Sequence, residues 1–153
     1  MKHKVLENLG LIVNGLSIAV FIFLGNLIEV SLRWPYFKYI GWILLGIGLF
    51  LIAVSTYTLI SNRGKGLIDW GIYGIVRHPM YVGAMLAFLS WVFFLPHWLT
   101  LLIASINIVI VYLFILQGER RNLELFGSDY ESYIENVPRV NFIAGFLKSL
   151  LRR

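Results

Sequence analysis

The longest stretch of this sequence without a charged side chain comprises 40 residues, from Pro79 to Gly118. A helix of about 20 apolar residues is enough to cross a bilayer, so the stretch is twice as long as one crossing needs. Pro96 and His97 lie near its middle, where a proline can end a helix and a polar pair can face water. The stretch is therefore predicted to form a hairpin of two membrane spans that turns at this pair.

Two further charge-free stretches, residues 8–28 and 39–62, are each long enough to cross a bilayer as a helix. The composition agrees, because 59% of the residues are hydrophobic and the mean hydropathy is +0.79, whereas soluble domains are about half apolar. We therefore expect one all-α domain over residues 1–153, a polytopic transmembrane bundle of about four spans with cytosolic C-terminal amphipathic helices. The expected spans and tail are residues 8–30, 39–61, 79–95, 98–118 and 119–153.

The basic residues lie beside the apolar stretches and act as topology signals. Four spans would place the N-terminus, the loop from Ser61 to Arg77 and the C-terminal segment on one side, with 11 of the 13 Lys and Arg residues, and leave Arg33 and Lys38 opposite. The positive-inside rule then puts both termini and the active site in the cytoplasm. The net charge of +5 does not indicate a nucleic-acid partner, because no basic stripe with interleaved aromatics is present. The absence of cysteine excludes disulfides and a cysteine nucleophile.

After Gly118 the sequence becomes charged and amphipathic. A helix is expected to begin near Glu119 and to end at Gly127, and Ser128 with Glu131 fits a capping box that opens the next helix. Beyond the following proline, apolar residues recur at helical spacing, which predicts a helix lying in the plane of the lipid headgroups. These residues are Phe142, Ile143, Phe146, Leu147, Leu150 and Leu151.

A hairpin in the long charge-free stretch would bring its two ends to the same face of the membrane. It would place Arg77, His78 and Tyr81 opposite Glu119, in one candidate pocket at the cytosolic boundary. Ionisable groups at such a boundary are candidates for a functional site by default. The alternative interpretation of Arg77 and Glu119 is that they are ordinary charges that mark the ends of the spans.

Pro79 suits the first position of the third span, where its missing N–H costs nothing. The helix N-terminus that it exposes can attract a carboxylate, such as that of an amino-acid-like cofactor, although Pro79 would serve equally well as a plain helix starter. No metal site is predicted, because of the other two histidines His3 lies on a terminus and His97 on the opposite face from His78 in the expected topology.

Two linked motifs resemble those of a known superfamily. Residues 71–83, GIYGIVRHPMYVG, resemble the G-P-Y-x-x-V-R-H-P-x-Y-x-G motif of the isoprenylcysteine carboxyl methyltransferase and phospholipid methyltransferase superfamily, which is membrane-embedded and uses S-adenosylmethionine. Glu119 followed by residues 126–139, FGSDYESYIENVPR, is similar to the closing motif of the same superfamily. The likeness covers roughly residues 66–140, and the first two spans match only in being hydrophobic.

The resemblance implies S-adenosyl-L-methionine as the cofactor and specific residues that contact it. The implied cofactor-binding residues are Tyr73, Arg77, His78, Pro79, Tyr81, Gly83 and Glu119. The implied catalytic residues, of which the arginines are candidates to hold a substrate carboxylate, are Arg77, Glu119 and Arg139. This sequence departs from the motifs at Ile72 in place of proline, at Gly74 in place of arginine, and at Gly118, where the superfamily often has a second acid beside Glu119.

The activity that the resemblance implies is methyl transfer to a lipophilic or lipidated substrate at the membrane–cytosol boundary, most similar to O-methylation of an isoprenylcysteine carboxylate. Positioning alone can lower the barrier of such a transfer by about 7–11 kcal/mol, and a dry site favours a reaction between opposite charges. Three alternatives remain open, namely phospholipid N-methylation, NADPH-dependent reduction of a sterol-type membrane lipid, and a non-catalytic membrane scaffold. The expected partners are membrane lipids, and the oligomeric state is not predicted.

Overall fold

The structure is a computed structural model that describes residues 2–27 and 36–151. Within these residues it contains helices and no strand, which confirms the predicted all-α fold class. The elements are α1 (Lys2–Leu27), α2 (Tyr36–Ser61), the 3-10 turn η1 (Gly71–Gly74), α3 (Pro79–Phe94), α4 (Trp98–Phe126), α5 (Ser128–Asn136) and α6 (Phe142–Leu151).

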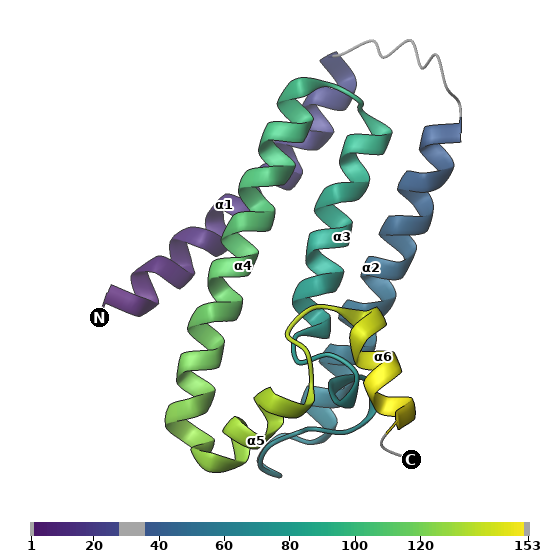
Figure 1. The fold of residues 1–153 in the computed structure, drawn as a ribbon. Helices are drawn as coiled ribbons and strands as arrows, with labels where there is room; N and C mark the ends of the chain where they lie inside the picture. Colours follow the sequence, from purple (N-terminus) through teal and green to yellow (C-terminus); the bar gives the residue numbers. More distant parts are fainter. Residues whose placement is uncertain (1, 28–35, 152–153) are drawn as a thin grey trace.

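The four longer helices form an elongated bundle in which α3 lies between α2 and α4, and α1 packs against α4 (Figure 1). The predicted hairpin is confirmed, because α3 ends at Phe94 and the antiparallel α4 begins at Trp98. His97 caps α4, since its Nδ1 accepts a hydrogen bond from the Leu99 amide at 3.2 Å. The short helices α5 and α6 lie together at the opposite end of the bundle from this turn (Figure 1).

Helix α2 buries mostly small side chains and directs large apolar ones outward. On α2 the buried residues are Gly41, Gly48, Leu51 and Ser55, whereas Trp42 and Phe50 are more than 60% exposed. Across the α1–α4 interface, Asn107 Nδ2 donates to Ser17 Oγ at 2.9 Å, as expected for a polar residue between membrane helices. An apolar exterior of this kind is suited to lipid.

Within the described residues, α2 and α4 are each long and apolar enough to cross a membrane. The apolar parts of α1 (Ile12–Leu27) and of α3 are shorter. At 16 residues, α3 is about 24 Å long, compared with about 30 Å of bilayer hydrocarbon. The four predicted spans therefore stay a prediction, and residues 28–30 of the first one lie outside the described part of the chain.

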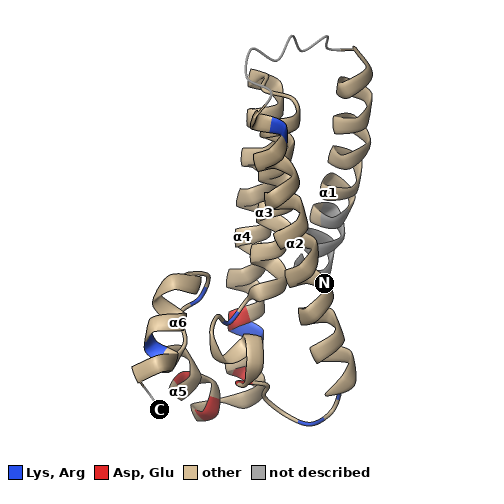
Figure 2. Ribbon diagram, turned by 90° about the vertical axis from the view of Figure 1, so that its right-hand side faces the viewer, with Lys and Arg blue, Asp and Glu red and all other residues tan. Residues whose placement is uncertain are grey.

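Charged residues gather at the end of the bundle that holds η1, α5 and α6, which we call the charged end (Figure 2). Among the described residues of α2, the one basic side chain is that of Lys38, which lies in the first turn of the helix, away from the charged end. The C-terminal α6 is an amphipathic helix as predicted, with Ile143 and Leu151 more than three-quarters exposed. Gly145 of α6 contacts the Ile75 carbonyl so closely that a larger residue would not fit.

Two details of the expected tail are wrong. The helix predicted to begin near Glu119 is the continuation of α4, because Gly118 keeps a helical conformation and glycine alone does not end a helix whose neighbours support it. The expected capping box is absent, because Gly127, with φ of 53°, occupies the N-cap position and Ser128 is already helical. With a single residue between α4 and α5, only glycine adopts the required turn without strain.

Candidate functional site

The continuity of α4 places Glu119 on the buried side of the bundle. The buried residues of α4 recur every three or four positions along one stripe, which consists of Thr100, Ala104, Asn107, Val111, Ile115 and Glu119. This spacing keeps all of them on the same face of a helix. Glu119 therefore points inward at the charged end, because it belongs to the same face of α4 that packs against the other helices along the rest of the bundle.

Glu119 accepts hydrogen bonds from two residues of the segment before α3. Arg77 Nε and Nη2 donate to Glu119 Oε1 at 3.1 and 2.7 Å. His78 Nε2 lies 3.3 Å from the same oxygen, and because a carboxylate only accepts, this nitrogen carries the hydrogen. Both side chains of the Arg77–Glu119 ion pair are less than 10% exposed. The hairpin thus brings together the arginine, the histidine and the acid that the sequence predicted to meet.

Arg139 completes this group, which we call the Glu119 cluster and which comprises Arg77, His78, Glu119 and Arg139. Its Nε and Nη2 lie 2.9 and 2.7 Å from Glu119 Oε2, and its Nη1 donates to the Tyr112 hydroxyl at 2.9 Å. The hydrogen bond to Glu119 raises the pKa of the Arg139 guanidinium above its usual value. Both carboxylate oxygens are therefore engaged by cationic or N–H groups, and the carboxylate is held in its ionised form.

Arg77 also forms hydrogen bonds that hold residues 134–139 against the segment before α3. Its Nη1 donates to the carbonyl oxygens of Ile134 at 2.8 Å and Val137 at 2.7 Å. The backbone amides of Arg77 and His78 donate to the carbonyls of Pro138 and Arg139 at 3.0 and 3.2 Å. The end of α5 and the residues after it are thus bonded directly to the segment that leads into α3.

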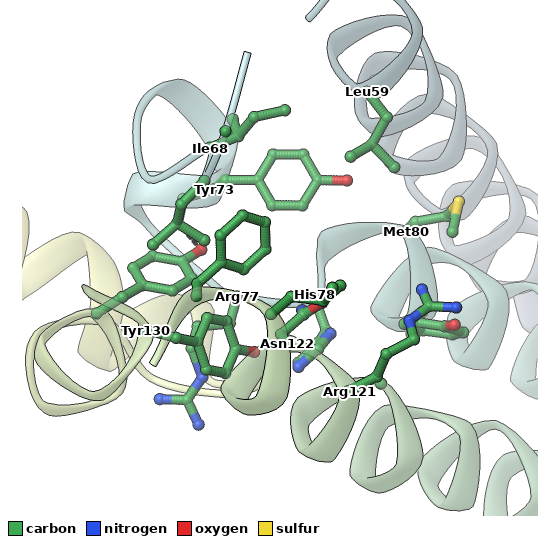
Figure 3. A pocket seen from close by; sticks show the side chains of 16 residues that line it. Leu59, Ile68, Tyr73, Arg77, His78, Met80, Arg121, Asn122 and Tyr130 are labelled. Carbon is green, nitrogen blue, oxygen red and sulfur yellow. Dashed lines mark hydrogen bonds between the residues drawn. The ribbon is translucent and has the colours of Figure 1, made fainter. Parts of the chain in front are cut away.

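A pocket of about 330 Å³ opens beside the Glu119 cluster, at the charged end (Figure 3). Arg77, His78, Arg121 and Asn122 give it a polar part, and apolar side chains such as Leu59 give it an apolar part (Figure 3). The lining residues come from α2, the loop before η1, η1 itself, the segment between η1 and α3, and helices α3, α4 and α5. They are Leu59, Gly66, Leu67, Ile68, Tyr73, Arg77, His78, Met80, Tyr81, Gly118, Arg121, Asn122, Leu125, Phe126, Tyr130 and Tyr133.

Tyrosines form much of the wall that α5 and η1 contribute. The Tyr133 hydroxyl donates to the Tyr73 carbonyl at 2.6 Å, which joins the two elements. Burial raises the pKa of Tyr73 to about 12 and raises that of Tyr133 as well. Tyr130 packs edge-on against Tyr133, with ring centroids 5.7 Å apart. The phenols are therefore neutral at physiological pH and present aromatic faces and hydroxyl groups to the pocket.

The structure brings most of the predicted site residues together, although not all of them reach the pocket. Tyr73, Arg77, His78 and Tyr81 line it. Three other predicted residues do not line the pocket, namely Pro79, Glu119 and Arg139. Pro79 is the buried first residue of α3, whereas Glu119 and Arg139 belong to the cluster described above.

Gly83 was also predicted to contact the cofactor, but it lies at the contact between α2 and α3. A Cβ atom at Gly83 would be 2.5 Å from the Gly48 carbonyl oxygen, and one at Gly48 would be 2.6 Å from the Gly83 carbonyl oxygen. Two small residues thus allow the two backbones to approach closely. In the structure Gly83 packs helices and does not line the pocket.

The part of the pocket that α4 supplies was not predicted from the sequence. Gly118, Arg121, Asn122 and Leu125 follow one another at helical spacing and form a stripe beside the buried one. That spacing is visible in the sequence, but the predicted helix break at Gly118 concealed it. The loop residues 66–68 also line the pocket, and apart from Gly66 nothing in their sequence indicated a functional site.

Comparison with known proteins gives the family. The chain matches the model of the phospholipid methyltransferase family over residues 19–127, which is more than half of its length. Comparisons with curated proteins and with solved structures found no match. The matched region includes α2, α3 and α4 entirely, so it extends farther toward the N-terminus than the likeness at residues 66–140, and it ends at residue 127, within the closing motif. This protein belongs to the phospholipid methyltransferase family, within the superfamily of membrane methyltransferases that also contains the isoprenylcysteine carboxyl methyltransferases.

Proposed function

We propose that this protein transfers a methyl group from S-adenosyl-L-methionine to a lipid at the cytoplasmic boundary of the membrane. The observation that carries the proposal is the pocket of about 330 Å³ at the charged end, in which polar and apolar walls meet beside the Glu119 cluster. Its volume falls at the lower end of the range for small-molecule sites, about 300–1,000 Å³. The concentration of basic residues at this end supports the cytoplasmic side.

The residues that line the pocket fit the proposed cofactor. Aromatic rings of Tyr73, Tyr81, Phe126 and Tyr130 line it, and their electron-rich faces attract a cation such as a sulfonium. Neither Asp nor Glu is among the described residues that line it, so a cofactor carboxylate would meet no repulsion. When bound, the cofactor supplies an electrophilic methyl group.

The protein's part in such a reaction is positioning and exclusion of water. The Glu119 cluster fixes Arg77 through a hydrogen bond of 2.7 Å and His78 through a longer contact of 3.3 Å, so the polar part of the pocket is preorganised. Leu59 near the end of α2 and Met80 in the first turn of α3 give an apolar wall on the side where the long helices enter the pocket. An acceptor lipid can place its head in the polar part while its tail stays in contact with apolar surface.

Two classes of acceptor suit this pocket, the amine of a phospholipid and the carboxylate of an isoprenylcysteine. The family match favours testing the phospholipid first, and the motif likeness to both branches of the superfamily keeps the carboxylate in the test. Reduction of a membrane lipid by NADPH requires a different cofactor in the same pocket, and a scaffold requires none. These alternatives are distinguished by the same experiment.

The experiment is methyl transfer by the purified protein in lipid nanodiscs with methyl-labelled S-adenosylmethionine. Nanodiscs contain phosphatidylethanolamine or an isoprenylcysteine. Parallel reactions contain NADPH and a sterol-type lipid instead, and in these the consumption of NADPH is followed by its absorbance. We expect label in one lipid class, and we expect His78→Ala to reduce the rate strongly, while His97→Ala, at the opposite end of the bundle, retains it. No labelled lipid in any reaction with wild-type protein would contradict the proposal.

A further inference from the structure

Three arginines lie at or beside the pocket, and two of them are already bonded to the protein. Arg77 donates to Glu119 and to two backbone carbonyls. Arg139 donates to Glu119 and to the Tyr112 hydroxyl. Neither can take a ligand's anion without giving up hydrogen bonds that hold the C-terminal segment in place, so neither is well suited to that role.

The third arginine, Arg121, differs from both. It is an exposed residue of α4 that lines the pocket, and its guanidinium extends from the helix toward the side where Met80 lies (Figure 3). Among the described residues no acid forms an ion pair with it, because the ion pairs of this part of the chain all involve Glu119. The pocket lining contributes two arginines, of which only Arg77 is neutralised by a protein carboxylate.

We propose that Arg121 binds a phosphate or carboxylate group of a molecule in this pocket and thereby selects an anionic ligand. A guanidinium presents paired N–H donors that match the oxygens of both groups. The interaction has its greatest effect at a pocket wall, where part of the surrounding water is excluded. Asn122, the next residue on α4, supplies an uncharged amide to the same wall.

The anion can come from the acceptor lipid or from the cofactor. A phospholipid carries a phosphate and an isoprenylcysteine a carboxylate, and the proposed cofactor has an amino-acid carboxylate. The identity of the molecule that supplies the anion rests on the proposed function. The preference for an oxyanion rests on the charges of the pocket alone. The experiment therefore measures binding separately for each source.

The test compares Arg121→Gln with Arg120→Gln, which removes the same charge from the adjacent exposed residue that does not line the pocket. Binding is measured by calorimetry with S-adenosylhomocysteine and with its decarboxylated analogue. In a second arm it is measured with short-chain phosphatidylethanolamine and with N-acetyl-S-farnesylcysteine, each beside a neutral analogue that lacks the phosphate or the carboxylate. Arg121→Lys keeps the charge without the paired donors.

We expect Arg121→Gln to weaken binding of an anionic ligand about tenfold, the size expected for loss of a partly exposed charged hydrogen bond. The analogue that lacks the anionic group should bind to wild type and to Arg121→Gln with the same affinity. For the anionic ligand, the affinity of Arg121→Lys should lie between those of wild type and Arg121→Gln, and Arg120→Gln should bind as the wild type does. The arm in which the loss occurs identifies the source of the anion.

Equal affinity of Arg121→Gln and wild type for all three anionic ligands would overturn the inference. So would an equal loss in Arg120→Gln, because the effect would then follow net charge and not the pocket. Loss of anion binding in Arg121→Gln, together with no methyl transfer by the wild type, would support this inference and contradict the proposed function. The two can therefore fail independently.

Discussion

Replacement of Glu119 by alanine tests whether the Glu119 cluster holds the charged end together. The change would leave the buried Arg77 guanidinium without its carboxylate, in a site where the side chains of the pair are 5% and 8% exposed. Removing one partner of a buried ion pair typically costs about 3–5 kcal/mol, because the remaining charge stays desolvated. In a protein of this size such a loss corresponds to a fall in Tm of about 10 °C.

The assay is thermal unfolding of the purified protein in detergent, followed by tryptophan fluorescence. Glu124→Ala is the matched control, because Glu124 is an exposed residue of the same helix with no ion pair among the described residues, so its loss should cost less than about 0.5 kcal/mol. The double variant Arg77→Met with Glu119→Leu should recover part of the loss, since it removes both buried charges. If Glu119→Ala unfolds at the same temperature as Glu124→Ala, the cluster does not stabilise the fold and the reasoning is wrong.

Three further predictions concern the helix contact and the tyrosines. Gly83→Val should lower the unfolding temperature much more than Gly46→Val, because a Cβ at Gly83 would be 2.5 Å from the Gly48 carbonyl whereas one at Gly46 has no atom within 4 Å; equal effects would contradict the packing role. Tyr133→Phe should cost about 1–3 kcal/mol in chemical unfolding, because the buried Tyr73 carbonyl loses its donor, and no change would show that water replaces it. Burial raises the pKa of Tyr73 to about 12, so ultraviolet titration at pH 11 should show one more protonated phenol in the wild type than in Tyr73→Phe, and equal numbers would contradict this.

The hairpin, and the contact between Arg77 and Glu119 that follows from it, could be predicted from the sequence because the residues that indicate the turn lie close together in the chain. Pro96 and His97 interrupt an uncharged tract of twice the spanning length, and Pro79 marks where α3 begins. Given that topology, the meeting of Arg77 with Glu119 follows from chain geometry, and the structure contains it.

Other features depended on contacts between distant segments and could not be read from the sequence. The carbonyls of Ile134 and Val137 accept hydrogen bonds from Arg77 because α5 turns back from the end of α4 toward the segment before α3. Nothing in the two side chains indicates these bonds. The packing role of Gly83 becomes visible only when Gly48 of another helix is placed against it. Arg121 was missed for a simpler reason, since the span was expected to end at residue 118 and a new helix to begin near Glu119, whereas α4 continues through both.

The most direct test of the account is whether the cofactor binds in the pocket that α4 helps to form. Gly118 lines this pocket, and a Cβ there has no atom within 4 Å, so Gly118→Trp should fill the pocket without straining the helix. Gly46→Trp is the matched control, because Gly46 lies in a helix, has equally open space and is not in the pocket lining. With radiolabelled S-adenosylmethionine, we predict that wild type and Gly46→Trp bind and that Gly118→Trp does not. Binding to Gly118→Trp with wild-type affinity would contradict the account.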